Sequence, residues 1–183
     1  MVKTSNLAEK EKWVMLRIVG FYKDPFNYEK LMSVIGQSEN GRSHKKVSLR
    51  LVDWFVTNYS KKFNIVYPIK RPNGKTEYFS VYQNYRQQVS SYPKKLFDPF
   101  CRSNLIKIQL CGQFVETTVC QLHFFKWAIE NLLLEYIEKN HDDIYKDMSE
   151  HCPRPRGNAV KKVKMQLSTS IHQKMLVLSC TSD

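Results

Sequence analysis

Basic and aromatic residues alternate through residues 42–107, a combination that suits contact with a polyanion. This stretch holds fourteen Lys and Arg against three Asp and Glu. Cations neutralise phosphate groups, and exposed aromatic faces stack on unpaired bases. Most aromatic side chains at helical spacing belong to a core, so we assign nucleic-acid contact to the loop cations instead. The aromatic residues concerned are Trp54, Tyr59, Tyr67, Tyr78, Phe79, Tyr82, Tyr85, Tyr92, Phe97 and Phe100.

Two sets of cations are therefore candidate nucleic-acid-binding residues. The first set lies in predicted loops of the basic stretch and consists of Arg42, Lys45, Lys46, Lys70, Arg71, Lys75, Lys94, Lys95 and Arg102. The second set lies near the C-terminus and consists of Arg154, Arg156, Lys161, Lys162 and Lys164. Charge indicates a polyanion without choosing among polyanions. The alternative interpretation is that these side chains only keep the surface soluble.

Cysteine and histidine residues supply the ligand types that a zinc site uses. The candidates are Cys101, Cys120, His123 and Cys152. Cys120 and His123 are three residues apart and would share one face of a helix. However, the chain has no CxxC pair, and buried free cysteines with an ordinary histidine explain these residues with fewer assumptions. We therefore expect neither a metal nor another cofactor.

No motif for an enzyme is present in the sequence. GxSxG, HExxH, a P-loop and a dinucleotide-binding fingerprint are all absent. Asp142, Asp143 and Asp147 fall together late in a predicted helix, where we expect them to form a solvated face. A metal-dependent nuclease needs carboxylates converging from different elements, such as Asp53, Asp98 and Glu116 around one cleft. The sequence therefore predicts a protein that is not an enzyme.

Charge is segregated along the 183 residues, whose net charge is +12. Residues 116–150 carry three Lys and Arg against eight Asp and Glu, whereas residues 154–175 carry six cations and no acid. Such segregation raises the local potential that attracts a polyanion. No apolar run reaches the roughly 18 residues of a membrane span, and the N-terminus lacks the apolar core of a secretory signal. Five cysteines without regular spacing favour a reducing compartment.

Two long helices are predicted to organise an α+β fold. The first covers about 48–63 behind Ser48 as N-cap, and the second covers 117–148 with a potential break near Asn140. Residues 8–22 fit a helix or a helix running into a strand. The remaining predicted elements are a helix at 27–36, strands at 64–69 and 77–82 around a turn at 71–75, a helix at 82–92, a strand–turn–strand at 104–116 and a C-terminal strand pair within 160–180.

Three parts are expected along the chain. Residues 1–47 form an N-terminal helical segment and a mobile loop, and residues 48–150 form the core α+β domain. Residues 151–183 form a basic linker and a C-terminal strand pair that completes the same domain. A single core is reasonable because a chain of this length can bury one of substantial size.

Three segments resemble a little-characterised family of large nucleocytoplasmic DNA viruses, whose members are described as replication or DNA-binding and packaging factors. They are SLRLVDWFVTNYSKKFNIVY (48–67), SVYQNYRQQVSSYPKKLFDPFCR (80–102) and ETTVCQLHFFKWAIENLLLEYI (116–137). The run from Phe97 to Arg102 is the most specific part. Where the family has a second basic residue after the Cys-Arg pair, this chain has Ser103, which puts a cation's role there in doubt. The resemblance implies a viral protein of a replication compartment or the virion.

Charge and resemblance together predict a non-enzymatic nucleic-acid-binding protein that acts in replication, transcription or genome packaging. DNA is the expected partner ahead of RNA, and no membrane partner is expected. The acidic 116–150 region is left for a protein partner or for self-association. The alternatives are a structural or assembly protein of the virion, a protein–protein adaptor and, third, a metal-dependent nuclease. The expected location is the host cytoplasm or nucleus, within a viral replication compartment, or the virion.

Overall fold

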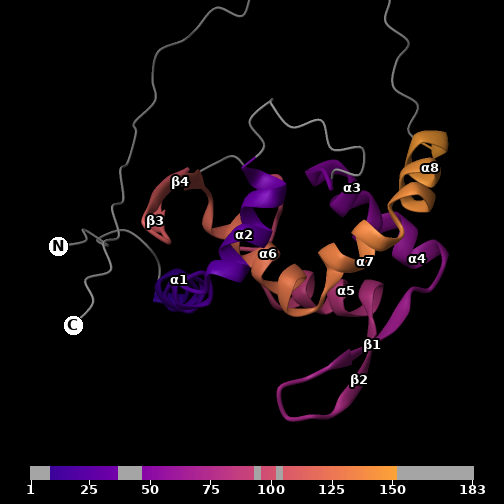
Figure 1. Ribbon diagram of the computed structural model, residues 1–183, viewed down its shortest axis with the longest axis horizontal. Coiled ribbons are helices and arrows are strands. Elements are labelled where there is room, and N and C mark those ends of the chain that lie inside the picture. Colours follow the sequence, from indigo (N-terminus) through magenta and orange to yellow (C-terminus); the bar gives the residue numbers. More distant parts are fainter. Residues whose placement is uncertain (1–8, 37–46, 93–95, 102–104, 152–183) are drawn as a thin grey trace, which may run out of the picture.

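The computed structural model describes residues 9–36, 47–92, 96–101 and 105–151, which form helices around one core and two hairpins (Figure 1). The helices are α1 (Glu9–Phe21), α2 (Pro25–Ile35), α3 (Leu49–Trp54), η1 (Phe55–Tyr59), α4 (Ser60–Lys62), α5 (Val81–Ser91), α6 (Val119–Glu130), α7 (Leu133–Lys139) and α8 (His141–His151). The strands are β1 (Val66–Lys70), β2 (Thr76–Ser80), β3 (Ile106–Leu110) and β4 (Gln113–Thr117). This mixture confirms the α+β prediction. None of the helices in these ranges is long and apolar enough to cross a membrane.

Helix α6 forms the centre of the core because it is apolar on nearly all sides. Eight of its 12 residues are buried, and Leu122, Phe124 and Phe125 are completely so. A helix that is hydrophobic all round is typical of the middle of a domain. Helices α1 and α2 both pack against it, and the Tyr22 hydroxyl donates a buried hydrogen bond to the Leu122 carbonyl at 3.0 Å. The N-terminal helices therefore share one contiguous core with residues 48–150.

Side-chain caps fix where three of the helices begin. Asp24 caps α2 with a 2.9 Å bond from the Phe26 amide, and Pro25 occupies the first helical position. The hydroxyls of Ser48 and Thr118 accept amide hydrogen bonds at the starts of α3 and α6, each at 3.2 Å. An N-cap of this kind satisfies one of the backbone donors that a helix start leaves open. The predicted start at Ser48 and the predicted helix at 27–36 are thus confirmed.

The predicted helix at 48–63 is continuous but changes its winding. It begins as α3, passes through the π-helical turn η1 and ends as α4. Within it the hydroxyls of Thr57 and Ser60 donate to the carbonyls of Asp53 and Val56 at 2.7 and 3.0 Å. A π turn inserts into an α-helix only occasionally, and helical periodicity does not reveal it.

The predicted helix at 117–148 is wrong as a single element, because the chain breaks twice. Helix α6 ends before Asn131, Leu132 adopts a left-handed backbone with φ 55°, and α7 follows. A second break at Asn140 separates α7 from α8, as expected from the sequence. At both breaks an Asn side chain donates to the carbonyl four residues earlier, Asn131 to Trp127 at 2.7 Å and Asn140 to Tyr136 at 2.8 Å. Asn competes in this way with the helical hydrogen-bond pattern.

The two hairpins confirm the predicted strand pairs. Strands β1 and β2 pair antiparallel with Val66 opposite Ser80, and Gly74 takes the left-handed turn conformation at φ 76°. Strands β3 and β4 likewise pair around Cys111 and Gly112, which both have positive φ. Residues 8–22 prove helical as α1, and the helix expected at 82–92 is α5. The strand pair predicted within 160–180 lies outside the described residues.

Asp147 fastens α8 to the first long helix, which corrects the expectation of a solvated acidic face. Its carboxylate accepts hydrogen bonds from the Trp54 indole at 2.9 Å and from Lys62 Nζ at 2.5 Å. The side chain is only 8% exposed. Burial acts to raise the pKa of Asp147, but the bonds from Lys62 and Trp54 outweigh it and hold the pKa below its usual value.

Replacing Asp147 with Asn should lower the free energy of unfolding by about 1–3 kcal/mol at neutral pH, the usual loss when a charged hydrogen bond is broken. A carboxylate whose pKa falls on folding stabilises the folded state above its unfolded pKa of about 4. That contribution is lost as the pH falls through the folded pKa. The difference between wild type and the variant should therefore shrink below about pH 4. Urea unfolding at several pH values measures it.

The matched control is Asp143→Asn, which removes an exposed carboxylate from the same helix. It should change stability by less than about 0.5 kcal/mol. Equal losses for the two variants, or a loss for Asp147→Asn that does not change with pH, would show that the carboxylate does not clamp α8.

Candidate nucleic-acid interface

The structure describes three of the predicted nucleic-acid-binding cations, and all three lie on the β1–β2 hairpin. Lys70 ends β1, while Arg71 and Lys75 lie in the turn. The hairpin extends away from the helices (Figure 1). The other candidates lie outside the described residues: Arg42, Lys45, Lys46, Lys94, Lys95, Arg102, Arg154, Arg156, Lys161, Lys162 and Lys164.

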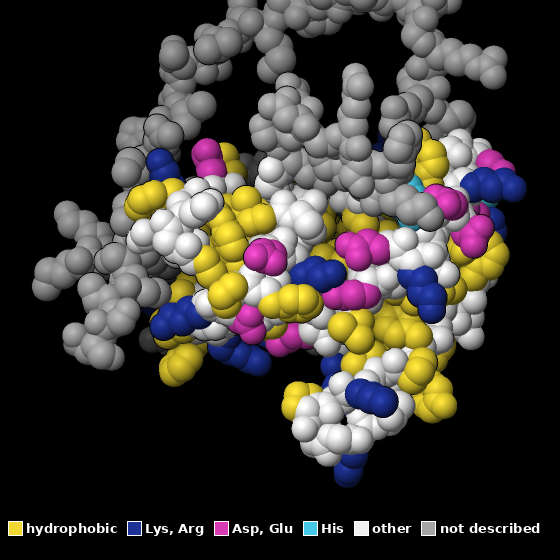
Figure 2. All heavy atoms as spheres, viewed as in Figure 1, with side chains coloured by type: hydrophobic (Ala, Val, Ile, Leu, Met, Phe, Trp, Pro, Cys, Tyr) yellow, Lys and Arg dark blue, Asp and Glu magenta, His cyan; other side chains and the backbone are white. Residues whose placement is uncertain are grey.

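Lys70, Lys75 and Tyr78 form what we call the basic hairpin. Both lysines are exposed, and neither forms an ion pair within the described ranges. Tyr78 is 76% exposed, whereas its neighbour Phe79 is 1% exposed and packs in the core. This difference follows from the alternation of side chains along a strand. Figure 2 shows Lys and Arg side chains on the protruding hairpin, while the acidic side chains visible on this face lie away from it.

Arg71 anchors the hairpin instead of presenting a free charge. Its Nε donates to Glu77 at 2.8 Å, and its Nη2 and Nη1 donate to the Asn131 side chain and the Glu130 carbonyl at 2.9 and 3.2 Å. The Tyr67 hydroxyl adds a 2.7 Å bond to the Asn131 carbonyl. A guanidinium with its donors occupied in this way is less able to contact a phosphate, so the geometry favours an anchoring role for Arg71.

Helix α5 carries one cation, Arg86, that was not among the predicted binding residues. It follows β2 directly and packs against it. Arg86 is exposed and lies one turn after Tyr82, whose ring is 5.6 Å from Lys61 Nζ. A shallow, open hollow runs along the helix and is lined by Tyr82, Gln83, Arg86, Gln87, Ser90 and Ser91. The i, i+4 spacing of Tyr82 and Arg86 is the sequence signal for this pair, which lies on a helix and not in a loop.

Much of the acidic charge expected to face a partner is used inside the molecule. Glu135 and Glu138 pair with Lys30 at 3.3 and 3.8 Å. Glu130 pairs with Lys126 one helical turn earlier, and Asp147 pairs with Lys62. Asp142, Asp143 and Glu150 are exposed on α8, and Asp142 lies 3.2 Å from His141 Nδ1. Helix α8 therefore holds three of the exposed acids through which the 116–150 region could meet a partner.

Two of the four zinc candidates meet in space. The Cys101 thiol hydrogen-bonds with Cys120, and the Thr118 hydroxyl contacts both the Cys101 carbonyl at 3.2 Å and Cys120 Sγ at 3.1 Å. His123 turns elsewhere, with Nδ1 2.8 Å from the Leu96 carbonyl. Among the residues that the structure describes, no three metal-ligating side chains converge. Cys152 lies outside these residues.

Of the three carboxylates considered for a nuclease, Asp53 and Asp98 lie close enough to interact, and Glu116 does not join them. Burial raises the pKa of Asp53, and the nearby charge of Asp98 raises it further. The same two carboxylates, after burial, raise the pKa of Tyr85. Glu116 lies on the exposed side of the other hairpin, opposite Lys107 in the β3–β4 register. It does not contribute to the shift at Asp53, so the described residues show a pair of acids and not a converging triad.

Comparison with known proteins found a family model and a viral relative. The model of a family of unknown function (DUF7197) matches residues 5–175. An uncharacterized protein of Acanthamoeba polyphaga mimivirus, a large nucleocytoplasmic DNA virus, is 36% identical over 142 residues. The match covers 74% of this chain and 54% of that protein, so the chain spans about half the length of its relative. No solved structure matches. The viral resemblance is thereby supported, whereas replication and packaging are not named by either match.

The cysteines should differ in their reaction with iodoacetamide. Burial, followed by the hydrogen bond from Cys101, raises the pKa of Cys120 to about 11. Because the thiolate is the reactive form, Cys120 should stay unmodified in the folded protein at neutral pH. Cys111 is exposed and should be alkylated first. Peptide mass spectrometry measures the order, and denatured protein, in which both react, is the control. Modification of Cys120 as fast as Cys111 in the folded state would contradict this environment.

Proposed function

We propose that this chain, which belongs to the DUF7197 family of unknown function, is a non-enzymatic nucleic-acid-binding protein of a large DNA virus. The observation that carries the proposal is the basic hairpin. It presents two lysines that form no ion pair within the described ranges and a tyrosine that is 76% exposed, on a projection that Arg71 ties to Asn131. Lysines neutralise phosphates, and an exposed tyrosine stacks on a base.

The anchoring of the hairpin supports a binding role. An isolated two-stranded hairpin is at best marginally stable in water. Here Arg71 and Tyr67 tie it to the end of α6 through Asn131. Binding then orders few additional groups, so little of the interaction energy is lost to conformational entropy.

The proposed partner is DNA ahead of RNA, because the viral relative comes from a DNA virus. The proposed process is replication, transcription or genome packaging, in a viral replication compartment or in the virion. The lysines of the basic hairpin should contribute little sequence preference, since phosphate contacts carry little base information. The net charge of +12 strengthens attraction to any nucleic acid at low salt.

Virion assembly is the second candidate, and α1 favours it. Trp13 and Leu16 are 69% and 66% exposed and lie three residues apart on one helix face. A pair of large exposed apolar side chains can seat a second subunit. Sedimentation velocity without nucleic acid separates the candidates: growth in size with concentration favours assembly, and a constant monomer favours binding.

Neutralising the basic hairpin should weaken binding in a salt-dependent way. In the variant Lys70→Gln with Lys75→Gln, affinity for single-stranded DNA should fall. The slope of log affinity against log salt should drop by about 1.4, or about 0.7 for each lost phosphate contact. Fluorescence anisotropy at several salt concentrations measures both quantities. The matched control, Lys139→Gln with Lys146→Gln, removes the same charge from exposed positions in the acidic region. If the two double variants changed affinity and salt slope equally, the binding surface would not be the basic hairpin.

Tyr78→Ala separates stacking from charge. Loss of one base–aromatic stack should reduce affinity for single-stranded DNA by about tenfold and leave the salt slope unchanged. Duplex DNA, whose bases are already stacked, should be affected less. The same anisotropy assay measures the change. No change in affinity for either form would show that Tyr78 does not contact bases.

A further inference from the structure

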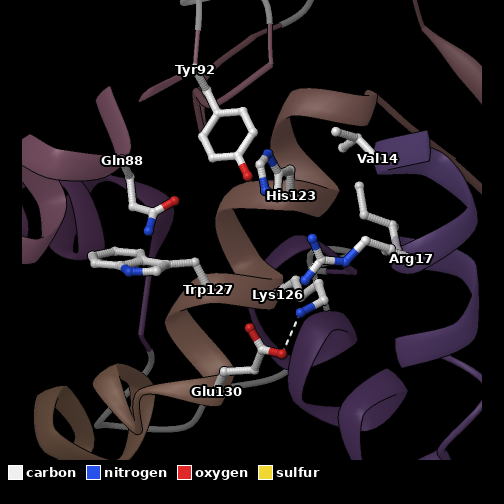
Figure 3. Close-up of a pocket in the computed structure, with 9 residues that line it drawn as sticks. Val14, Arg17, Gln88, Tyr92, His123, Lys126, Trp127 and Glu130 are labelled. Atoms are coloured by element: carbon white, nitrogen blue, oxygen red, sulfur yellow. Dashed lines mark hydrogen bonds and ion pairs between the residues drawn. The ribbon is translucent and has the colours of Figure 1, made fainter. Parts of the chain in front are cut away.

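A cavity of about 150 Å³ lies between α1, α5 and α6, apart from the basic hairpin. Figure 3 shows its lining: Arg17 reaches in from α1, Gln88 and Tyr92 approach from the side of α5, and His123 and Trp127 come from α6. Three separate elements therefore contribute side chains to one enclosed space. The exposed Lys70, Lys75 and Tyr78 of the basic hairpin do not line it.

The walls of the cavity are aromatic and sized for one ring. Trp127 is 5% exposed, and the rings of Tyr92 and His123 meet edge to face with their centroids 4.5 Å apart. A cavity of about 150 Å³ is known to hold a single six-membered ring such as benzene. Sites for larger ligands are typically 300 Å³ or more. The space thus fits one planar ring beside aromatic side chains and is small for a fused pair of rings.

The polar groups of the cavity offer both donors and acceptors. His123 Nδ1 donates to the Leu96 carbonyl at 2.8 Å, because a carbonyl can only accept. Burial lowers the pKa of His123, the hydrogen bond to the Leu96 carbonyl opposes this shift, and the charges of Lys126 and Arg17 add to the lowering. In the neutral ring with its proton on Nδ1, Nε2 is an acceptor. The Gln88 amide, which has no side-chain partner within the described ranges, supplies a further donor and acceptor. This set complements the edge of a pyrimidine.

The mouth of the cavity is positively charged. Lys126 is paired with Glu130, and the dashed line in Figure 3 marks this pair. Arg17 is exposed and has no ion pair among the residues that the structure describes. Its guanidinium matches the oxygens of a phosphate in shape and charge. A ligand with a small ring inside and a phosphate at the rim therefore satisfies the groups present.

We infer that this cavity takes one unpaired pyrimidine base of a single-stranded nucleic acid, with the adjoining phosphate at Arg17. The inference rests on the proposed nucleic-acid binding and adds strandedness and base preference to it. Recognition of an unstacked base between aromatic side chains is the usual means of reading single strands. Helix α5 connects the two sites, since it follows the hairpin and is about 16 Å long.

Filling the cavity tests this inference. The probes are fluorescent oligothymidylate and oligodeoxyadenylate of equal length, titrated by anisotropy. Wild type should prefer the pyrimidine strand by about tenfold, the scale of one stacked base. Val14→Phe, at the half-buried rim, should abolish the preference by lowering affinity for oligothymidylate alone. Arg17→Gln should weaken oligothymidylate binding about threefold, and Lys12→Gln, an exposed position on the same helix, should leave it unchanged.

The outcomes distinguish the cavity from the hairpin. Circular dichroism must show the same thermal unfolding for Val14→Phe as for wild type. If the folded variant still prefers oligothymidylate, or if wild type binds both strands equally and in a salt-dependent manner, the cavity assignment is overturned while the proposed function stands. If wild type binds neither strand at low salt, the proposed function fails and the inference fails with it.

Discussion

Asn131 joins the end of the central helix to the projecting hairpin, and the proposed binding surface depends on this junction. Its side chain donates to the Trp127 carbonyl, its side-chain oxygen accepts from Arg71, and its backbone carbonyl accepts from Tyr67. Each such bond contributes on the order of 1 kcal/mol, and the charged one contributes more. The residue that ends α6 thus also fixes the hairpin. Together with the buried side chains of Ile69 and Phe79, it keeps the hairpin from being an isolated two-stranded ribbon of marginal stability.

The same constraint relates the hairpin to the cavity. Trp127, whose carbonyl receives the Asn131 bond, also forms one wall of the cavity on α6. Helix α5 runs from the end of β2 toward that wall and supplies Gln88 on the way. In the proposed account, a single strand contacts the basic hairpin with its phosphates and follows α5 until one base enters the cavity. The core in this view is a rigid support that sets the spacing between two contacts.

Local chemistry in the sequence was sufficient to predict many of the elements. Ser48 identified the start of a helix, Asn73 and Gly74 identified a hairpin turn, and Asn140 marked a break. The helix end at Asn131 was not predicted, because the apolar periodicity continues through Leu132 as it would in an unbroken helix. Periodicity records which positions are apolar, and it does not register a left-handed residue or a side chain that replaces a backbone bond.

The candidate functional residues were harder to predict, because the position of a charged residue in the sequence does not show which groups its side chain contacts. Arg71 and Lys75 are equally basic in the sequence, yet Arg71 is bound to three neighbours and Lys75 faces solvent. Likewise, Asp147 was predicted to be one of several solvated acids, but it is buried and accepts hydrogen bonds from Trp54 and Lys62. The cavity could not be found from sequence at all, since Arg17, Gln88 and His123 come from segments far apart in the chain.

Hydrogen–deuterium exchange of the whole chain, with and without single-stranded DNA at low salt, tests the central claim most directly. Bound DNA should slow exchange in residues 66–80 of the β1–β2 hairpin and along α5, and should leave α8 unchanged. Exchange depends on the stability and burial of each backbone amide, so protection locates the contact without any substitution. Protection confined to α8 or to other parts of the chain, with the hairpin unaffected, would contradict the account.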